Sequence, residues 1–255
     1  MSESTPVLTL DGPLAVITLN RPTHRHRLHA ADLVVLKDHL SRIDADPAIR
    51  VAVLQSDATA ANGVFCAGYH IGEHGAEADD ATFAQIVDML EDLRPPTLCA
   101  LSGDVYGGAT DLVLACDFTI AVDTVRMRMP AAALGLHYYP SGIVRYVSRL
   151  GVLQAKRAFL TATHFEADEL LAIGYVQALT QADRLAEEIT ALAARIVQLA
   201  PMAVQHLKRS INEVARGDYD PARLLARQRD TQASRDFTEG QAAFFERRPP
   251  HFTGH

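Results

Sequence analysis

The sequence of 255 residues has no tryptophan, only three cysteines, and no run of about 20 uncharged apolar residues that could span a membrane. The short polar start, residues 1–6, leads into no apolar segment of the kind that directs secretion. Cys66, Cys99 and Cys116 are odd in number and widely spaced, which argues against both a disulfide framework and a zinc site. We therefore expect reduced thiols and a cytoplasmic protein without membrane contact.

The sequence also has fewer basic than acidic residues. The 24 lysines and arginines are outnumbered by 31 aspartates and glutamates, and the formal net charge is −7. Such a balance argues against a nucleic-acid-binding surface, although it permits a local basic pocket for a phosphorylated ligand. The hydrophobic share of 48% is enough to bury one large core.

Strand and helix patterns alternate through the first half of the chain. Strands are expected at residues 7–10, 14–19, 51–54, 97–101 and 118–122, and helices at 30–43, 82–93 and 108–115. From Ser141 the pattern is helical almost to the end, with stops at Gly151, Gly174, Pro201 and Gly217. This order predicts an α/β fold with a core over residues 1–200 and a C-terminal helical region over residues 201–255.

Two glycine-containing segments lie where a predicted strand meets a turn or a helix. They are Phe65-Cys66-Ala67-Gly68 and the segment 102–111, which includes Gly107-Gly108. Small residues let a backbone N–H approach a ligand oxygen, and a helix start favours a developing anion. Two such N–H groups would form an oxyanion hole. Close packing is the alternative explanation for each segment taken alone.

Taken together, five motifs resemble the crotonase superfamily in the correct order. They are Asn20-Arg21-Pro22, Phe65-Cys66-Ala67-Gly68, the segment 103–111, Pro130 with Leu134-Gly135, and the segment 236–248. The resemblance implies a core of ββα turns arranged in a spiral, a C-terminal helical trimerisation region, and a homotrimer or a dimer of trimers. It also implies an acyl-CoA thioester substrate, no separate cofactor or metal, and an oxyanion hole formed by the backbone N–H groups of Ala67 and Gly108.

The expected acid and base depart from the hydratases of this family, which carry two glutamates. Asp111 stands at the first position, shorter on the order of 1.5 Å in reach, and Ala131 stands at the second. Hydration needs one group to activate water and another to protonate carbon, whereas a double-bond shift needs a single proton carrier. Asp111 alone therefore favours isomerisation, although an acidic residue early in a helix also stabilises the helix dipole without any catalytic role.

Two further side chains could compensate for the missing glutamate. His70 follows the first oxyanion segment, and Tyr138 occupies a position where methylmalonyl-CoA decarboxylases of the family also carry tyrosine. The histidine of those decarboxylases falls one residue earlier than His70, so the match is incomplete. Decarboxylation of a malonyl-type acyl-CoA and a catalytically poor acyl-CoA-binding protein are the alternatives to isomerisation. His70 as a surface residue and Tyr138 as a packing residue are the corresponding structural alternatives.

The resemblance also indicates residues for binding the CoA part of the substrate. Gly68 allows close backbone approach, Arg25 and Arg27 are candidate phosphate partners, and Phe244 and Arg247 match residues that reach the adenosine phosphate from a neighbouring subunit. His24, His26 and His29 lie near Arg25 and Arg27, and we interpret them as part of a solvated basic face rather than as metal ligands.

Overall fold

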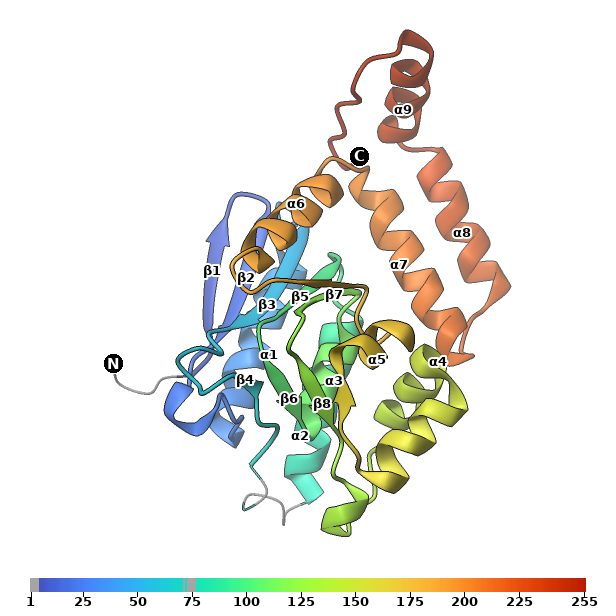
Figure 1. Ribbon diagram of the computed structural model, residues 1–255. Coiled ribbons are helices and arrows are strands. Elements are labelled where there is room, and N and C mark those ends of the chain that lie inside the picture. The colour runs from blue at the N-terminus through green and yellow to red at the C-terminus, as the bar shows by residue number, and fades with distance from the viewer. Residues whose placement is uncertain (1–4, 71, 73–76) are drawn as a thin grey trace.

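The computed structural model describes residues 5–70, 72 and 77–255, and it contains two sheets (Figure 1). The six-stranded sheet has the order β1 (Val7–Asp11), β2 (Leu14–Leu19), β3 (Val51–Ser56), β5 (Thr97–Leu101), β7 (Phe118–Val122) and β10 (Ala178–Thr180). The four-stranded sheet has the order β4 (Val64–Cys66), β6 (Asp104–Tyr106), β8 (Arg126–Arg128) and β9 (Phe165–Glu166). Among the strand pairs of the described residues, β1–β2 and β8–β9 are antiparallel and the others are parallel.

From β3 to β8, consecutive strands alternate between the two sheets, and helices follow the pairs. The pair β3 and β4 precedes α2 (Glu77–Glu91), the pair β5 and β6 precedes α3 (Gly108–Ala115), and β7 is followed by β8. Each pair contributes one strand to the large sheet and one to the small sheet. This repetition is the ββα spiral that the resemblance implied, so the predicted fold class is confirmed.

Further helices cover the sheets and extend beyond them. They are α1 (Ala30–Ala45), α4 (Pro140–Lys156), α5 (Ala167–Ala172), α6 (Leu185–Val197), α7 (Pro201–Arg216), α8 (Pro221–Gln232) and α9 (Arg235–Glu246). Proline at the first position begins α4, α7 and α8, where its missing N–H costs no hydrogen bond. Within the described part of the chain, no helix combines the length and apolarity needed to cross a bilayer.

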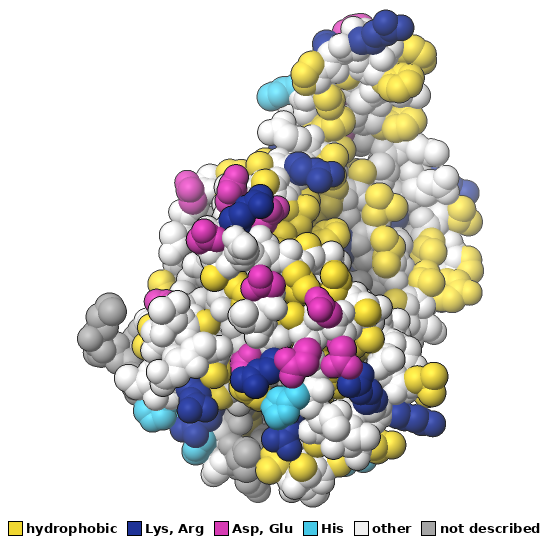
Figure 2. Space-filling view, viewed as in Figure 1, with side chains coloured by type: hydrophobic (Ala, Val, Ile, Leu, Met, Phe, Trp, Pro, Cys, Tyr) yellow, Lys and Arg dark blue, Asp and Glu magenta, His cyan; other side chains and the backbone are white. Residues whose placement is uncertain are grey.

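In the C-terminal helical part α7 packs against α4 and α9 protrudes furthest from the two sheets, whereas α6 packs against β3, β5 and β7 (Figure 1). Hydrophobic side chains gather on the surface of the part formed by α7 to α9 (Figure 2). Those exposed by 50% or more are Leu207, Ile211, Tyr219, Leu225, Phe244 and Phe245. The turn at residue 200 separates α6 from α7, and the division of the chain into two regions there stays a prediction.

Short strands account for most differences from the predicted elements. The strands β4, β6, β8, β9 and β10 have only two or three residues, too few to show a period of alternation. Gly151, where a helix was expected to stop, has the non-helical angles φ 77° and ψ 161°, so α4 consists of two helical segments that meet at a kink there.

Candidate active site

A cavity of about 230 Å³ lies at the carboxyl ends of three parallel strands of the small sheet. Residues 67–69 follow β4, residues 107–108 follow β6, and residues 129–131 follow β8, and all of them line the cavity. Phe83 and residues 136–139 complete its wall. Because parallel strands present their carboxyl ends on one edge, three loops far apart in the sequence meet at one place.

The first two loops touch each other closely at Gly68. This residue has φ +92°, and a Cβ on it would lie 2.8 Å from the Tyr106 carbonyl oxygen and 3.3 Å from the Gly108 nitrogen. Any side chain larger than hydrogen would therefore push the two loops apart. Gly108 is the first residue of α3, where a backbone N–H has no acceptor within the helix and the dipole is positive.

The Ala67 N–H, predicted as one of the two donors of the oxyanion hole, has a partner outside the cavity. The N–H of Ala67 donates to the Arg25 carbonyl oxygen at 2.9 Å, so the expectation that it points into the cavity was wrong. The Gly68 carbonyl accepts the Leu28 N–H at 2.9 Å, and the N–H of Tyr69 points the opposite way because their shared peptide bond is trans. Tyr69 and Gly108 both line the cavity.

The carboxylate of Asp111 is fully buried in α3 and is not part of the cavity wall. Arg145 Nη1 donates to its Oδ2 at 2.8 Å, and the Tyr139 hydroxyl donates a short hydrogen bond to the same oxygen. The Tyr138 hydroxyl lies 3.5 Å from it. Tyr138 and Tyr139 line the cavity in front of the carboxylate, so Asp111 does not open onto the cavity as expected.

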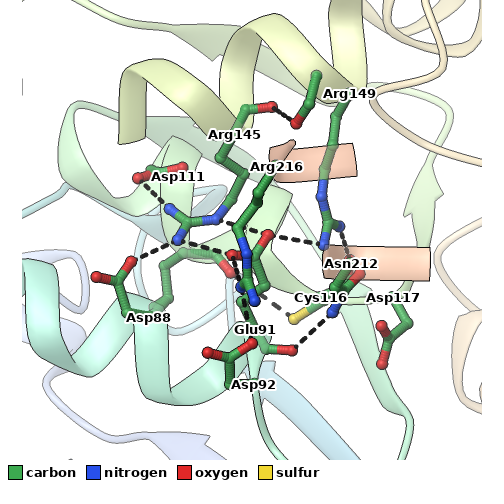
Figure 3. A network of polar contacts seen from close by, with 12 residues as sticks. Asp88, Glu91, Asp92, Asp111, Cys116, Asp117, Arg145, Arg149, Asn212 and Arg216 are labelled. Atoms are coloured by element: carbon green, nitrogen blue, oxygen red, sulfur yellow. Dashed lines mark hydrogen bonds and ion pairs between the residues drawn. The ribbon is translucent and has the colours of Figure 1, made fainter. Parts of the chain in front are cut away.

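Arg145 is itself buried and connects Asp111 to a larger ionic network (Figure 3). Its Nη2 donates to Asp88 at 2.7 Å, and its Nε lies 3.1 Å from Glu91. Arg149 and Arg216 both lie 3.1 Å from Glu91 as well, and Arg216 brings α7 into the network. Burial raises the pKa of Glu91, but the three arginines outweigh it and hold that pKa below its usual value.

Where the family's second glutamate would stand, the cavity wall carries no ionisable side chain. Ala131 lines the cavity there and is almost completely buried. Among the described residues that line the cavity, none is an aspartate or glutamate. His70 is also absent from this described wall, and its ring stacks on His29 at a centroid distance of 4.7 Å.

The predicted CoA-binding residues lie in two separate parts of this chain. Arg25 lies close enough to Tyr106, at the cavity wall, for its charge to lower the pKa of that hydroxyl, although burial and Asp104 outweigh this and raise the pKa overall. Arg27 is half-buried in the same segment. Phe244 and Arg247 lie on the exposed end of α9, in the part that extends away from the sheets (Figure 1).

Comparison with known proteins agrees with this architecture. The sequence model described as "Enoyl-CoA hydratase/isomerase" matches residues 10–255. The chain is 31% identical over 269 residues to a carnitinyl-CoA dehydratase of Salmonella arizonae, and this match covers 100% of both chains. It is 28% identical over 256 residues to a crotonyl-CoA hydratase of Syntrophomonas wolfei, and that match covers 96% of both chains. The crystal structure of an enoyl-CoA hydratase from Bacillus anthracis superposes with a TM-score of 0.88 at 26% identity, over 99% of this chain and 100% of that one. This chain belongs to the enoyl-CoA hydratase/isomerase family, within the crotonase superfamily.

Proposed function

We propose that this enzyme of the enoyl-CoA hydratase/isomerase family forms a thioester enolate and shifts a double bond, rather than adding water across it. The observation that carries the proposal is the single acid–base group beside the cavity. The wall holds tyrosine hydroxyls backed by the Asp111 carboxylate, and it holds Ala131 where the family's second glutamate would stand. The N–H groups of Tyr69 and Gly108 are the proposed donors to the enolate oxygen, replacing the pair first predicted. One acid–base group is sufficient to move a proton between two carbons of the same substrate.

Crotonyl-CoA hydration is expected to be slower than turnover of a β,γ-unsaturated acyl-CoA by this enzyme. A well-placed acid or base contributes ~10²–10⁴ in rate, and Ala131 offers none to a water molecule on its wall. Both reactions can be followed by absorbance of the conjugated thioester, with binding measured separately. Fast hydration at a rate equal to that of isomerisation would contradict the proposal. Binding without turnover of any thioester would instead indicate a non-catalytic acyl-CoA-binding protein.

Decarboxylation of a malonyl-type acyl-CoA is the second candidate function. Loss of CO₂ generates the enolate directly and needs no base, and no described carboxylate on the cavity wall would repel the carboxylate of the substrate. The Tyr138 hydroxyl could then orient the departing group. Release of CO₂ from malonyl-CoA or methylmalonyl-CoA, faster than isomerisation, would favour this function over the first.

We also propose assembly into trimers, with α9 completing the CoA site of a neighbouring subunit. The support is the exposed apolar surface of α7 to α9, which includes Ile211 at 63% exposure and Phe244 at 79% exposure. Exposed apolar surface of this extent is typical of an interface between subunits. Light scattering should give a trimer or a hexamer, and a monomer at micromolar concentration would count against the proposal.

Arg247→Ala is expected to weaken binding of an acyl-CoA more than binding of the corresponding pantetheine thioester, which lacks the nucleotide. The guanidinium is the proposed partner of the adenosine phosphate, and a charge-assisted hydrogen bond is worth about 1.5–3 kcal/mol. Arg235→Ala, at the exposed start of the same helix, is the matched control. Equal losses for both ligands would remove Arg247 from the site.

A further inference from the structure

Two tyrosine hydroxyls separate the Asp111 carboxylate from the cavity. Tyr138 and Tyr139 line the wall, and the carboxylate lies behind them with no exposed surface. The Tyr139 hydroxyl donates directly to Asp111 Oδ2, whereas the Tyr138 hydroxyl is 3.5 Å from that oxygen and 3.3 Å from the Tyr139 oxygen. A substrate in the cavity therefore meets Tyr139 before it can meet the carboxylate.

The backbone of α4 makes room for this arrangement. A Cβ on Gly142 would lie 2.3 Å from the Tyr138 ring and 2.8 Å from Asp111 Oδ2, so glycine is needed where the helix passes both groups. Tyr139 precedes Pro140 and comes from extended backbone, while Arg145 comes from the helix that follows. Tyr139 and Arg145 thus hold the same carboxylate oxygen from two parts of one segment.

We propose that Tyr139 is the catalytic residue that carries protons between the bound acyl-CoA and Asp111, with Asp111 acting behind it as the proton store. This inference rests on the proposed double-bond shift. As the substrate C–H bond breaks, its electron pair moves into the enolate, and its proton bonds to the Tyr139 oxygen. The original hydroxyl proton of Tyr139 passes at the same time to Asp111 Oδ2. The reverse sequence returns a proton to the other carbon, so no proton is gained or lost overall.

The electrostatic surroundings support transfer of the hydroxyl proton from Tyr139 to Asp111. Burial raises the pKa of Tyr139, and the neighbouring Asp111 charge raises it further, so the hydroxyl keeps its proton and donates to the carboxylate. Burial also raises the pKa of Asp111, and the opposing effects of Arg145 and Tyr139 do not cancel it. A carboxylate with a raised pKa accepts a proton more readily than an exposed aspartate does.

Tyr139→Phe is expected to reduce kcat for isomerisation by ~10²–10⁴ while leaving thioester binding unchanged. Exchange of the α-protons of butyryl-CoA in D₂O, followed by NMR, should fall by the same factor because it requires enolate formation alone. Asp111→Asn should match that loss, and the double variant should lose no more, since two members of one relay are not additive. Tyr146→Phe, which removes a buried hydroxyl that bonds Thr110 and does not line the cavity, is the matched control and should retain most of the activity.

A second measurement separates a proton carrier from a packing residue. Replacing Tyr139 with 3-fluorotyrosine preserves its size but makes its hydroxyl more acidic, so it should change kcat for isomerisation at a fixed pH without changing thioester binding. The same replacement at Tyr146, which does not line the cavity, should leave kcat unchanged. Full activity of Tyr139→Phe, or an unchanged kcat with fluorotyrosine at 139, would overturn the relay. If the unmodified enzyme bound thioesters but catalysed neither exchange nor isomerisation, the proposed function itself would fail.

Discussion

Arg145→Met is expected to lower the free energy of unfolding by about 3–5 kcal/mol, the range typical of breaking a buried ion pair by removing one partner. The guanidinium is 1% exposed and lies within 3.1 Å of carboxylates from Asp88, Glu91 and Asp111. Asp111 and Glu91 are also buried, so they would lose their shared cation without gaining contact with water (Figure 3). Uncompensated buried charge, rather than lost packing, is the dominant cost, because methionine preserves much of the side-chain volume.

The matched control is Arg184→Met, which removes one partner of an exposed ion pair. Arg184, which precedes the first residue of α6, and Glu188 lie four residues apart, with side chains 59% and 40% exposed. Such pairs contribute about 0.3–0.5 kcal/mol. Denaturant unfolding at fixed protein concentration would compare the two variants, since assembly makes apparent stability depend on concentration. A loss below about 0.5 kcal/mol for Arg145→Met would show that water or another cation replaces the guanidinium.

The loss caused by Arg145→Met should also depend on pH. In the unmodified protein the pKa of Glu91 is held below its usual value, so its contribution to stability is present above the unfolded pKa of about 4.3 and is lost as pH falls through the folded pKa. Without Arg145 the Glu91 pKa rises, because only Arg149 and Arg216 remain to hold it down, and the ionised carboxylate is stabilised less. The difference between the two proteins should therefore be largest near neutral pH and shrink in acid.

The fold was largely predictable because its long elements have clear patterns and its motifs stand in family order. The hairpin of β1 and β2, helix α1 and the strands β3, β5 and β7 lie where residue periodicity places them. The small sheet was missed although it carries the cavity, because its strands are too short to show a period. Its strands are specified by pairing with one another, which no local pattern reveals.

The site was predictable as a set of segments but not as a set of atoms. The motif around Gly68 identified the correct loop, yet the direction of each N–H there depends on pairing with Leu28, which lies far away in the sequence. In the same way, the motif located Asp111 but not Arg145, which buries it. A lone arginine beside Tyr146 in the otherwise apolar first turns of α4 was the available signal, since arginine is almost never fully buried unless it is paired.

Gly68→Ala is expected to reduce kcat/KM by at least ~10³, because it displaces both proposed oxyanion donors together. Loss of one such donor typically costs ~10²–10³. The added Cβ would lie 2.8 Å from the Tyr106 carbonyl oxygen and 3.3 Å from the Gly108 nitrogen. Both neighbours are backbone atoms, which cannot rotate away as a flexible side chain could. The loop of residues 67–69 must therefore move away from α3, and the N–H groups of Tyr69 and Gly108 can no longer converge on one oxygen.

A control is needed because alanine at φ +92° is strained regardless of its neighbours, at a cost of order 1–3 kcal/mol. Gly174→Ala provides it, since Gly174 has φ +77° and no atom within 4 Å of the added Cβ. Both variants should lose comparable stability in denaturant unfolding, but only Gly68→Ala should lose turnover. Affinity for free CoA, which has no thioester oxygen, should change little in either variant. If Gly68→Ala kept normal turnover with ordinary stability loss, the thioester oxygen would have to bind elsewhere than between these two loops.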